Sequence, residues 1–479
     1  MPVNDEHESL APPRGLWSAQ FRWVTLGICL LVIVDAFESL AVTTIMPVVS
    51  RQLHGADLYA FAFAAPIALG LVGMVVAGFA ADRGKVIGVL LICVAIFMVG
   101  SAAAGLAPTM GFFVAARLVH GCAGGGLAVV LYVVIARIYP AELHPRIFAA
   151  TAAAWVLPSL IGPTVSGLAA QTVGWRWVFE GSVMLTAIAV VLVLPAIRVL
   201  RAETVSSPPQ PLTQQSRPLR LLFWSILLAF GILALSAAAD SSGAVRWVVV
   251  AVAAVVTVVA LRPLIPAGTL RASRGLPTVI LIRAVTAGAF SAAEVYVPLM
   301  LVTLYGESPA QAGFALSAAG LTWAGAAWVQ GKFPRICDRA TAVLAAAGMG
   351  LAMVSLMWGA VMKVPLAIII IGWAFAGAGM GFVSPRLGSA TLAYSTGLNQ
   401  GFNSSALNIA YSAGAALALA VTALVSSLFR EAGVPVEFFV IFATTALMCA
   451  LTWWLAPRMS AVSGSFDGAG DELSQNANG

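Results

Sequence analysis

Charged residues are scarce in this sequence. Only 9% of its 479 residues are Asp, Glu, Lys or Arg, whereas soluble domains carry about 25%. Hydrophobic residues make up 61% of the chain, and the mean hydropathy is +0.97. The apolar residues form runs near the ~20 residues that a helix needs to cross a bilayer. The composition therefore excludes a soluble enzyme and predicts an all-α membrane protein, because a helix satisfies its backbone groups within one segment.

Motifs of several other protein classes are missing as well. The sequence has no GxxxxGK[ST] loop, so nothing predicts an ATP phosphate site. The five cysteines form no CxxC pair and no metal-ligand spacing, so we expect no disulfide, no metal and no other cofactor. The net charge is +6, but the basic residues are scattered singly between apolar runs, which argues against a nucleic-acid partner.

Fourteen apolar segments, bounded by charges and Gly/Pro turns, predict the membrane helices. They cover residues 23–48, 59–81, 86–107, 111–136, 147–171, 178–197, 221–239, 245–261, 276–304, 310–331, 341–361, 364–384, 403–427 and 437–456. The first run is too long for the hydrophobic region of a signal peptide, so we expect it to remain as the first helix. The seventh and eighth segments are short and are joined only by residues 240–246, which makes them the least defined.

The polar stretches predict the domain organisation. Residues 201–220 are polar and Pro-rich, which is typical of a flexible linker, and the tail after Arg458 is rich in Gly, Ser and Asn. We expect six regions: a cytoplasmic N-terminus (1–22), an N-terminal six-helix bundle (23–198), a cytoplasmic linker (199–220), two additional helices (221–262), a C-terminal six-helix bundle (263–457) and a disordered cytoplasmic tail (458–479).

The basic residues predict the orientation. With both termini in the cytoplasm, 18 of the 25 Lys and Arg residues lie in cytoplasmic segments and five lie in outer loops. The remaining two, Arg117 and Arg283, fall within predicted spans. Basic residues are enriched on the cytoplasmic side of membrane proteins. We therefore expect a multi-pass protein of the plasma (inner) membrane with both termini in the cytoplasm.

Four short motifs lie within the predicted spans or next to them. They are DRGK at 82–85 after the second span, RLVHG at 117–121 in the fourth, PSLIGPTVSG at 158–167 in the fifth and WRWVF at 175–179 before the sixth. A second Asp-Arg pair, at 338–339, follows the tenth span. In this order the motifs resemble the signatures of the major facilitator superfamily, over essentially the full chain. The first loop is two residues shorter than the family pattern, and His120 stands where Gln is usual.

The count of six, two and six helices is similar to the fourteen-helix branch of drug:proton antiporters. This resemblance implies two six-helix bundles around a central cavity, with the seventh and eighth helices inserted between them. It also implies alternating access driven by an ion gradient, in a chain that we expect to work as a monomer in the lipid bilayer.

Carboxylates inside the predicted spans are the first candidates for function. Asp35 and Glu38 are three residues apart in the first span and therefore share a helix face. Arg117 enters the membrane from the outer end of the fourth span, and its side chain can reach either acid. Ionisable groups at such depth are costly unless they are paired or face water. We expect Asp35, Glu38, Arg117 and His120 to couple protons; the alternatives are a static buried ion pair and a His120 that only replaces Gln in packing.

A third carboxylate predicts where a substrate binds. Glu294 lies in the first helix of the second six, at a depth that matches Glu38. Aromatic residues suit a lipophilic or cationic compound, and the candidates are Trp155, Tyr296, Trp323, Trp328 and Tyr411. Of these we assign Tyr296, Trp155 and Trp323 to the substrate site with Glu294. Packing against lipid is an equally good interpretation for any single aromatic residue.

Two further groups predict conformational roles. Asp82 and Arg83 follow the second span; Asp82 can pair with Arg137 or cap the thirteenth span near Asn403, where exposed N–H groups favour an anion. Either contact would latch the cytoplasmic side, and the alternative is an ordinary basic turn. The fifth span contains a helix-packing motif of Gly162, Pro163 and Gly167. The proline predicts a bend in the span, and the glycines predict close approach of a neighbouring helix.

Together these features predict a secondary transporter, not an enzyme. The favoured function is proton-coupled efflux of hydrophobic or cationic drugs. Export of an endogenous lipid or metabolite and uptake of a solute are the alternatives. A receptor or scaffold is disfavoured, because it would not need carboxylates buried in both halves.

Overall fold

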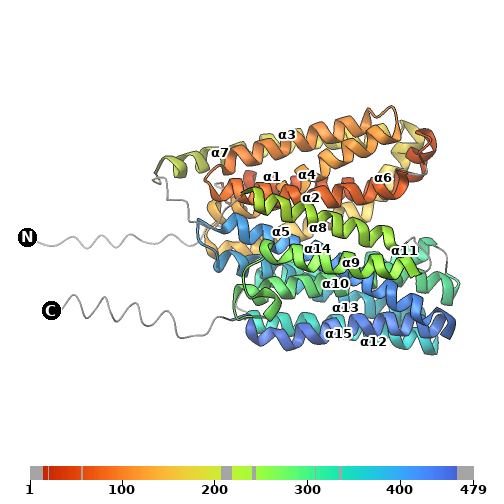
Figure 1. Cartoon of the computed structure of the whole chain (residues 1–479). Coiled ribbons are helices and arrows are strands. Elements are labelled where there is room, and N and C mark those ends of the chain that lie inside the picture. Colours follow the sequence, from red (N-terminus) through yellow and green to blue (C-terminus); the bar gives the residue numbers. More distant parts are fainter. Residues whose placement is uncertain are drawn as a thin grey trace, which may run out of the picture.

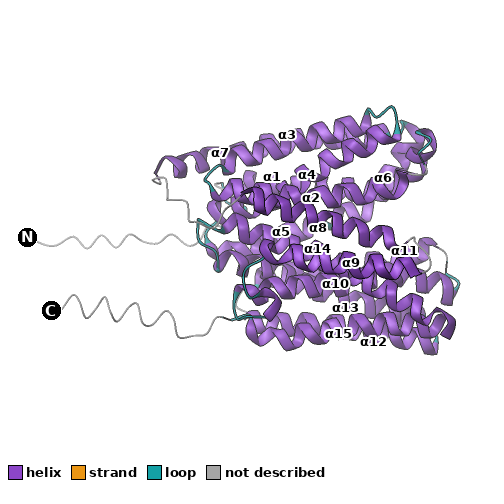
Figure 2. Ribbon diagram, viewed as in Figure 1, coloured by secondary structure: helices purple, strands orange, loops and turns teal. Residues whose placement is uncertain are grey.

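The computed structural model describes residues 15–19, 21–55, 58–206, 218–239, 244–307, 309–333 and 337–460. Within these residues the chain forms fifteen α-helices joined by short turns and 3-10 segments, and it contains no strand (Figure 2). The helices are α1 (Arg22–Gln52), α2 (Tyr59–Asp82), α3 (Val86–Gly105), α4 (Met110–Ile138), α5 (His144–Ala154), α6 (Val156–Thr172), α7 (Arg176–Ser206), α8 (Pro218–Ala239), α9 (Ala244–Leu261), α10 (Leu276–Tyr305), α11 (Pro309–Lys332), α12 (Asp338–Met362), α13 (Leu366–Ala393), α14 (Gln400–Phe429) and α15 (Val434–Leu455).

The helices pack into two bundles. In the N-terminal half α4 packs against α2 and α3, and α7 packs against α1 and α3. In the C-terminal half α13 packs against α11 and α12, while α10 packs against α14 and α15. Figure 1 shows α1, α3, α4 and α7 in the upper bundle and α12, α13 and α15 in the lower one. The remaining pair, α8 and α9, packs together and lies against α2 of one half and α14 of the other.

Twelve helices of the described chain are long and apolar enough to cross a membrane. They coincide with twelve of the fourteen predicted segments and confirm the all-helical, multi-pass class. The two other segments correspond to α8, where Leu219–Leu235 forms a shorter apolar helix, and to α11. The sequence of α11 contains four Gly, two Gln and two Trp residues, which lower its mean hydropathy. The predicted count of fourteen spans is therefore not confirmed.

Two differences from the predicted helix boundaries concern a helix break and the linker. The fifth predicted span is divided into α5 and α6 at Trp155, and not at Gly162–Pro163. Pro158 explains this position, because its ring removes the hydrogen bond to Ala154 and clashes with that carbonyl group. At the linker, α7 continues to Ser206, so the first residues of the predicted linker are helical. No Pro or Gly interrupts that stretch, and residues 207–217 lie outside the described part.

Glycines allow the closest helix contacts. A Cβ atom on Gly73 of α2 would collide with the carbonyl oxygen of Cys122 in α4, and one on Gly125 would collide with that of Gly70. In the other half, a Cβ atom on Gly377 of α13 would meet the backbone of α11 in the same way. Small residues bring membrane helices into backbone contact. The α2–α4 and α11–α13 pairs are therefore in backbone contact at the centre of each half.

The two halves meet at one end of the bundle, which we call the Asp82 end because α2 terminates there. Across one seam a Cβ atom on Gly78 of α2 would lie 2.6 Å from the carbonyl oxygen of Gly401 in α14. Across the other, a Cβ atom on Gly331 of α11 would lie 2.7 Å from Cβ of Ala149 in α5. Both seams are in close contact, so the structure is closed at the Asp82 end.

Candidate functional site

A buried carboxylate forms the centre of the N-terminal half. Glu38 of α1 has 0% exposed surface. The hydroxyl of Ser101 in α3 donates to its Oε1 at 2.5 Å, and Nε2 of His120 in α4 lies 3.0 Å from its Oε2. Nη1 of Arg117, one turn before His120, lies 3.8 Å from Oε1. Three helices therefore bring one acid, one base and one permanent cation together.

The hydrogen bonds within this cluster assign the proton on the neutral histidine. Nη1 of Arg117 lies 3.2 Å from Nδ1 of His120. A guanidinium can only donate, so Nδ1 accepts and the ring hydrogen sits on Nε2. Nε2 then donates to Glu38, which completes a closed ring of three side chains. Protonation of Glu38 or of His120 changes the hydrogen bonds of the other two members.

Asp35 lies one turn before Glu38 and is half-buried. It is within electrostatic range of His120, Glu38 and Arg117. Its Oδ1 is 3.4 Å from the position that a Cβ atom on Gly124 would take, so this glycine leaves room for the carboxylate. The structure thus brings together all four residues to which proton coupling was assigned. In the described chain no group of three His, Cys, Asp or Glu residues has a geometry that would hold a metal ion.

Sequence reasoning missed the α3 side of this cluster. Ser101 bonds to Glu38, the ring of Phe97 lies 4.3 Å from that of His120, and a Cβ atom on Gly100 would crowd the His120 backbone. Ser101 is the one hydroxyl residue in the sequence of α3. A single polar residue in an apolar span was therefore the available signal.

The proposed substrate residues do not form one cluster. Glu294 of α10 is exposed and lies within electrostatic range of Tyr411 in α14. Tyr296 faces another way, because two residues turn a helix by about 200°, and its neighbours include Thr422 and Glu437. These contacts separate Tyr296 from the environment of Glu294.

The two tryptophans differ from each other. The ring of Trp323 packs edge-on against Phe290 at 5.2 Å, and Phe290 stacks on Trp373 in the core of the C-terminal half. Trp155 is 45% exposed at the break between α5 and α6. Trp323 therefore belongs to a packed core, whereas Trp155 is available for contact.

A second intramembrane cation was counted in the sequence but given no role. Arg283 lies within α10, and its Nη1 donates to the hydroxyl of Ser384 in α13 at 2.9 Å. Its guanidinium carbon lies 4.6 Å from the centre of the Tyr411 ring. Its partners come from distant parts of the chain and are neutral, so no charge pattern in the sequence pointed to them.

At the Asp82 end, one carboxylate joins the two halves. Oδ1 of Asp82 accepts from the backbone N–H of Gly401 at 2.6 Å, and Oδ2 accepts from that of Phe402 at 2.8 Å. These N–H groups belong to the first turn of α14, which begins at Gln400 and not at the predicted residue 403. An anion is stabilised at such a position by the helix dipole.

The arginines near Asp82 play smaller parts. Arg137 lies within electrostatic range of Asp82. Arg83 is exposed, and its guanidinium carbon lies 3.8 Å from the centre of the Phe79 ring. In the other half Asp338 bonds to Arg386, which lies in the same half. The two Asp-Arg loops therefore differ, since only Asp82 is bonded across the seam.

Two of the glycines that were assigned to helix packing lie against α1. A Cβ atom on Gly162 would lie 3.6 Å from Phe37, and one on Gly167 would lie 3.6 Å from Thr44. Both distances are ordinary van der Waals contacts, so neither position requires glycine here. The side chain of Pro163 lies outside the described part of the chain.

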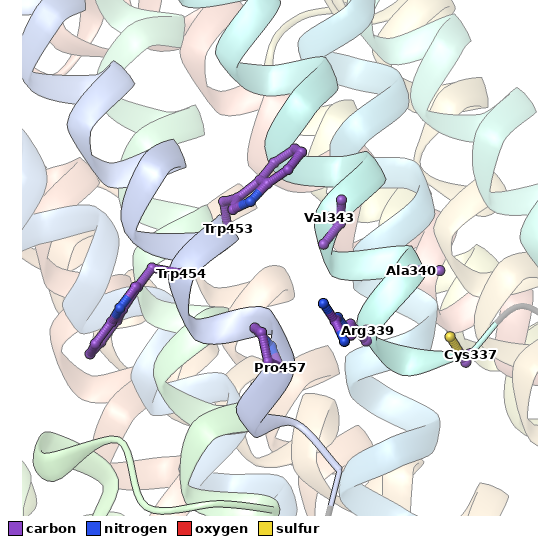
Figure 3. Close-up of a pocket in the computed structure, with 7 residues that line it drawn as sticks. All are labelled: Cys337, Arg339, Ala340, Val343, Trp453, Trp454 and Pro457. Atoms are coloured by element: carbon purple, nitrogen blue, oxygen red, sulfur yellow. The ribbon is translucent and has the colours of Figure 1, made fainter.

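A pocket of about 500 Å³ lies elsewhere, between α12 and α15 (Figure 3). Figure 3 shows Trp453 of α15 and Arg339 of α12 on facing helices, whereas Trp454 points away from α12. Both helices belong to the C-terminal half, so this pocket is separate from the cluster around Glu38. We assign it no role in transport.

The family of the chain follows from comparison with known proteins. A family model described as Major Facilitator Superfamily matches residues 28–418. The chain belongs to the major facilitator superfamily. The members of this superfamily are transporters and not enzymes, and the twelve candidate spans agree with a multi-pass membrane protein.

Relatives within the superfamily match only part of the chain. Multidrug resistance protein 3 of Bacillus subtilis is 26% identical over 176 residues, which cover 37% of this chain and 34% of that protein. The MFS efflux transporter aclA of Aspergillus oryzae is 26% identical over 210 residues, covering 43% and 37%. The chain thus spans about a third of the length of the curated relatives it matches.

Solved structures extend the likeness of the fold to 91–92% of the chain. The human organic anion transporter MFSD10 superposes with a TM-score of 0.65 at 16% identity, covering 91% of this chain and 99% of that one. The proton:xylose symporter XylE gives a TM-score of 0.62 at 15% identity, covering 92% and 97%. At these identities the likeness establishes the fold alone.

Proposed function

We propose that this transporter exports hydrophobic or cationic compounds from the cytoplasm in exchange for protons. The observation that carries the proposal is the closed ring of Glu38, His120 and Arg117, with Ser101 as a fourth partner. Glu38 is entirely buried, and a buried acid next to a base and a cation is the arrangement that proton relays use inside membranes. One relative is named as a multidrug resistance protein and another as an efflux transporter, which agrees with export.

Proton binding at Glu38 would change the stability of the ring. The carboxylate accepts from Ser101 and His120 and balances the charge of Arg117. A neutral carboxyl group leaves that cation without its counter-ion, so the protonated cluster favours a different arrangement of α1 and α4. A ligand that binds two conformations unequally shifts their populations. Here the proton is that ligand, and Asp35 is the half-buried group through which it reaches Glu38.

The proposed orientation places the Asp82 end in the cytoplasm, with both termini on that side of the plasma membrane. The described structure is then outward-facing, because both seams are closed at the Asp82 end. In this arrangement α8 and α11 complete the fourteen spans, and Asp82 with Arg83 and Arg137 forms the latch. The chain works as a monomer, since each half contributes its own charged groups.

The proposal is tested in proteoliposomes that contain the purified protein. Addition of a lipophilic cation to vesicles with a pre-formed pH gradient should release protons in proportion to the compound transported. Export of an endogenous lipid or metabolite would instead leave every added drug without effect. Solute uptake would reverse the direction of the proton movement relative to the substrate.

Cysteine labelling tests the orientation. In a chain whose own cysteines are replaced, single cysteines at Ser206 and Ser465 should be protected from an impermeant thiol reagent in intact cells. A cysteine at Ser242 should be labelled. Of these positions only Ser206 lies in the described part of the chain. Labelling at 206 with protection at 242 would invert the proposed orientation, and protection at all three would show that α8 and α9 do not span.

Glu294→Gln tests the substrate site. The carboxylate is exposed beside Tyr411, so we expect its neutralisation to impair transport of cationic compounds by about tenfold and to spare neutral ones. A charged hydrogen bond or ion pair of this kind contributes about 1.5–3 kcal/mol. The measurement is the initial transport rate of a cationic and a neutral dye in the same vesicles. If the variant transports both dyes at their wild-type rates, Glu294 is not part of the substrate site.

A further inference from the structure

Arg283 lies where the two halves meet inside the membrane. It is seven residues from the start of α10, or roughly 10 Å along the helix. Its guanidinium donates to Ser384 and stacks on Tyr411. Tyr132 of α4, from the other half, lies within its electrostatic range. Four helices, α4, α10, α13 and α14, therefore surround this cation.

Among the residues that the structure describes, Arg283 has no carboxylate partner. In the described part of the chain no carboxylate lies within 4.0 Å of it, and its Nε is buried without a hydrogen-bond partner. Arg117, the intramembrane arginine of the other half, has Glu38 at 3.8 Å. A guanidinium carries five N–H donors, and a charge at this depth is costly unless it is paired. Arg283 is thus a half-buried cation with unused donors, and no described residue serves as its counter-ion.

Four residues, which we call the polar strip, connect one end of α10 to its middle: Arg283, Tyr411, Ser291 and Glu294. Arg283 and Glu294 are eleven positions apart in α10, which is about three turns, so they share a helix face roughly 16 Å apart. Tyr411 spans part of this distance. Its ring lies against Arg283, its hydroxyl bonds to Ser291, and Glu294 is within its electrostatic range. One face of α10 therefore offers a cation at one end and an anion at the other.

We propose that Arg283, with Ser384, Tyr411 and Tyr132, binds an anionic group on the substrate. The planar guanidinium presents a pair of donors that matches the two oxygens of a carboxylate or sulfonate. The phenol ring of Tyr411 beside the guanidinium provides a flat apolar surface for an aromatic body. The transporter therefore accepts zwitterionic and anionic aromatic amphiphiles in addition to cations. This inference rests on the proposed export function and extends its substrate class.

A matched pair of dyes tests the proposal. The methyl ester of a rhodamine is a cation, whereas the free acid of the same dye carries an additional carboxylate. Wild-type protein in proteoliposomes should transport both. Arg283→Gln should lower the initial rate for the free acid by about tenfold or more, because a charged hydrogen-bonded contact is lost. The rate for the ester should stay at the wild-type level.

Two further variants make the result specific. Arg246→Gln is the matched control, since Arg246 of α9 bonds to the backbone oxygen of Ala423, outside the strip; it should leave the ratio of the two rates unchanged. Arg283→Lys keeps the positive charge but loses the planar pair of N–H donors, so it should reduce free-acid transport less than Arg283→Gln does. If Arg283→Gln does not fold, Arg283→Lys alone decides, with a selective loss of free-acid transport expected.

Other outcomes would overturn the proposal. They are a wild type that does not transport the free acid, an equal loss of both dyes in the Arg283 variants, and an unchanged ratio in those variants. Proton release during ester transport is recorded in parallel. Its absence would refute the proposed coupling, while the ratio of the dyes would still report on Arg283.

Discussion

Glu38→Gln is expected to abolish proton-coupled transport, to the level of empty vesicles. The substitution keeps the shape of the side chain and removes the group that binds the proton. Its effect should therefore appear as loss of drug-induced proton release in proteoliposomes, with substrate binding retained. If the variant keeps full proton-coupled transport, the ring around Glu38 is structural and the proposed mechanism is wrong.

The same substitution should also destabilise the fold. Removing one partner of a buried ion pair typically costs about 3–5 kcal/mol, because the other charge is left uncompensated. The amide oxygen can still accept from His120, so we expect a smaller loss of about 1–3 kcal/mol. The amide nitrogen must then face Arg117, which only donates. Thermal unfolding in detergent measures this loss.

Glu180→Gln is the matched control for Glu38→Gln. Glu180 is a partly buried carboxylate of the same half, in α7, and its Oε1 lies 2.8 Å from the position of a Cβ atom on Gly105. The structure gives it no contact with His120 or Arg117. Its neutralisation should leave proton release unchanged. Equal losses in the two variants would indicate a general effect of charge on the bundle.

The partners of the charged residues around Glu38 could be predicted from the sequence, because a charge inside the bilayer is costly unless it is paired. Asp35 and Glu38 share a helix face by their spacing, and pairing with a nearby cation lowers the free-energy cost of burying them. The structure indeed brings Arg117 and His120 to Glu38. Neutral partners carry no such constraint. Ser101 and the residues around Arg283 come from other helices, and no spacing rule connects them.

The sequence did not correctly predict which residues of α10 share an environment, nor where the fifth predicted span breaks. Glu294 and Tyr296 are close in sequence, yet their environments differ because they point to different sides of α10. The break at Trp155 was displaced from its predicted position because Pro158 and Pro163 lie in the same segment. The sequence alone does not say which proline interrupts the helix, since neighbouring helices decide where the freed carbonyl group is tolerated.

Asp82→Asn is expected to open the Asp82 end. The wild-type carboxylate accepts two backbone hydrogen bonds from α14 across the seam. An amide can accept only one of them and turns a donor toward the other N–H group. At about 1.5–3 kcal/mol for each charged hydrogen bond, the closed state should lose about 2–4 kcal/mol relative to the open state. This corresponds to roughly 30- to 1,000-fold in their equilibrium constant.

A cysteine at Ser405 reports this opening. Ser405 is buried, and its Cβ lies 3.1 Å from the position of a Cβ atom on Gly78 across the seam. With the other cysteines replaced, it should react slowly with a thiol reagent applied from the Asp82 end, and much faster in the Asp82→Asn background. Transport should fall while substrate binding remains, because the change acts on a conformational equilibrium and not on the ligand.

Asp338→Asn separates latching from general loosening. Asp338 occupies the corresponding loop of the other half, but it bonds to Arg386 within that half. Its neutralisation breaks an ion pair without releasing a contact between the halves, so the labelling rate at 405 should not change. Equal acceleration by both variants would mean that charge loss loosens this end non-specifically. Wild-type labelling and transport in a well-folded Asp82→Asn protein would leave the loop with only an orienting role under the positive-inside rule.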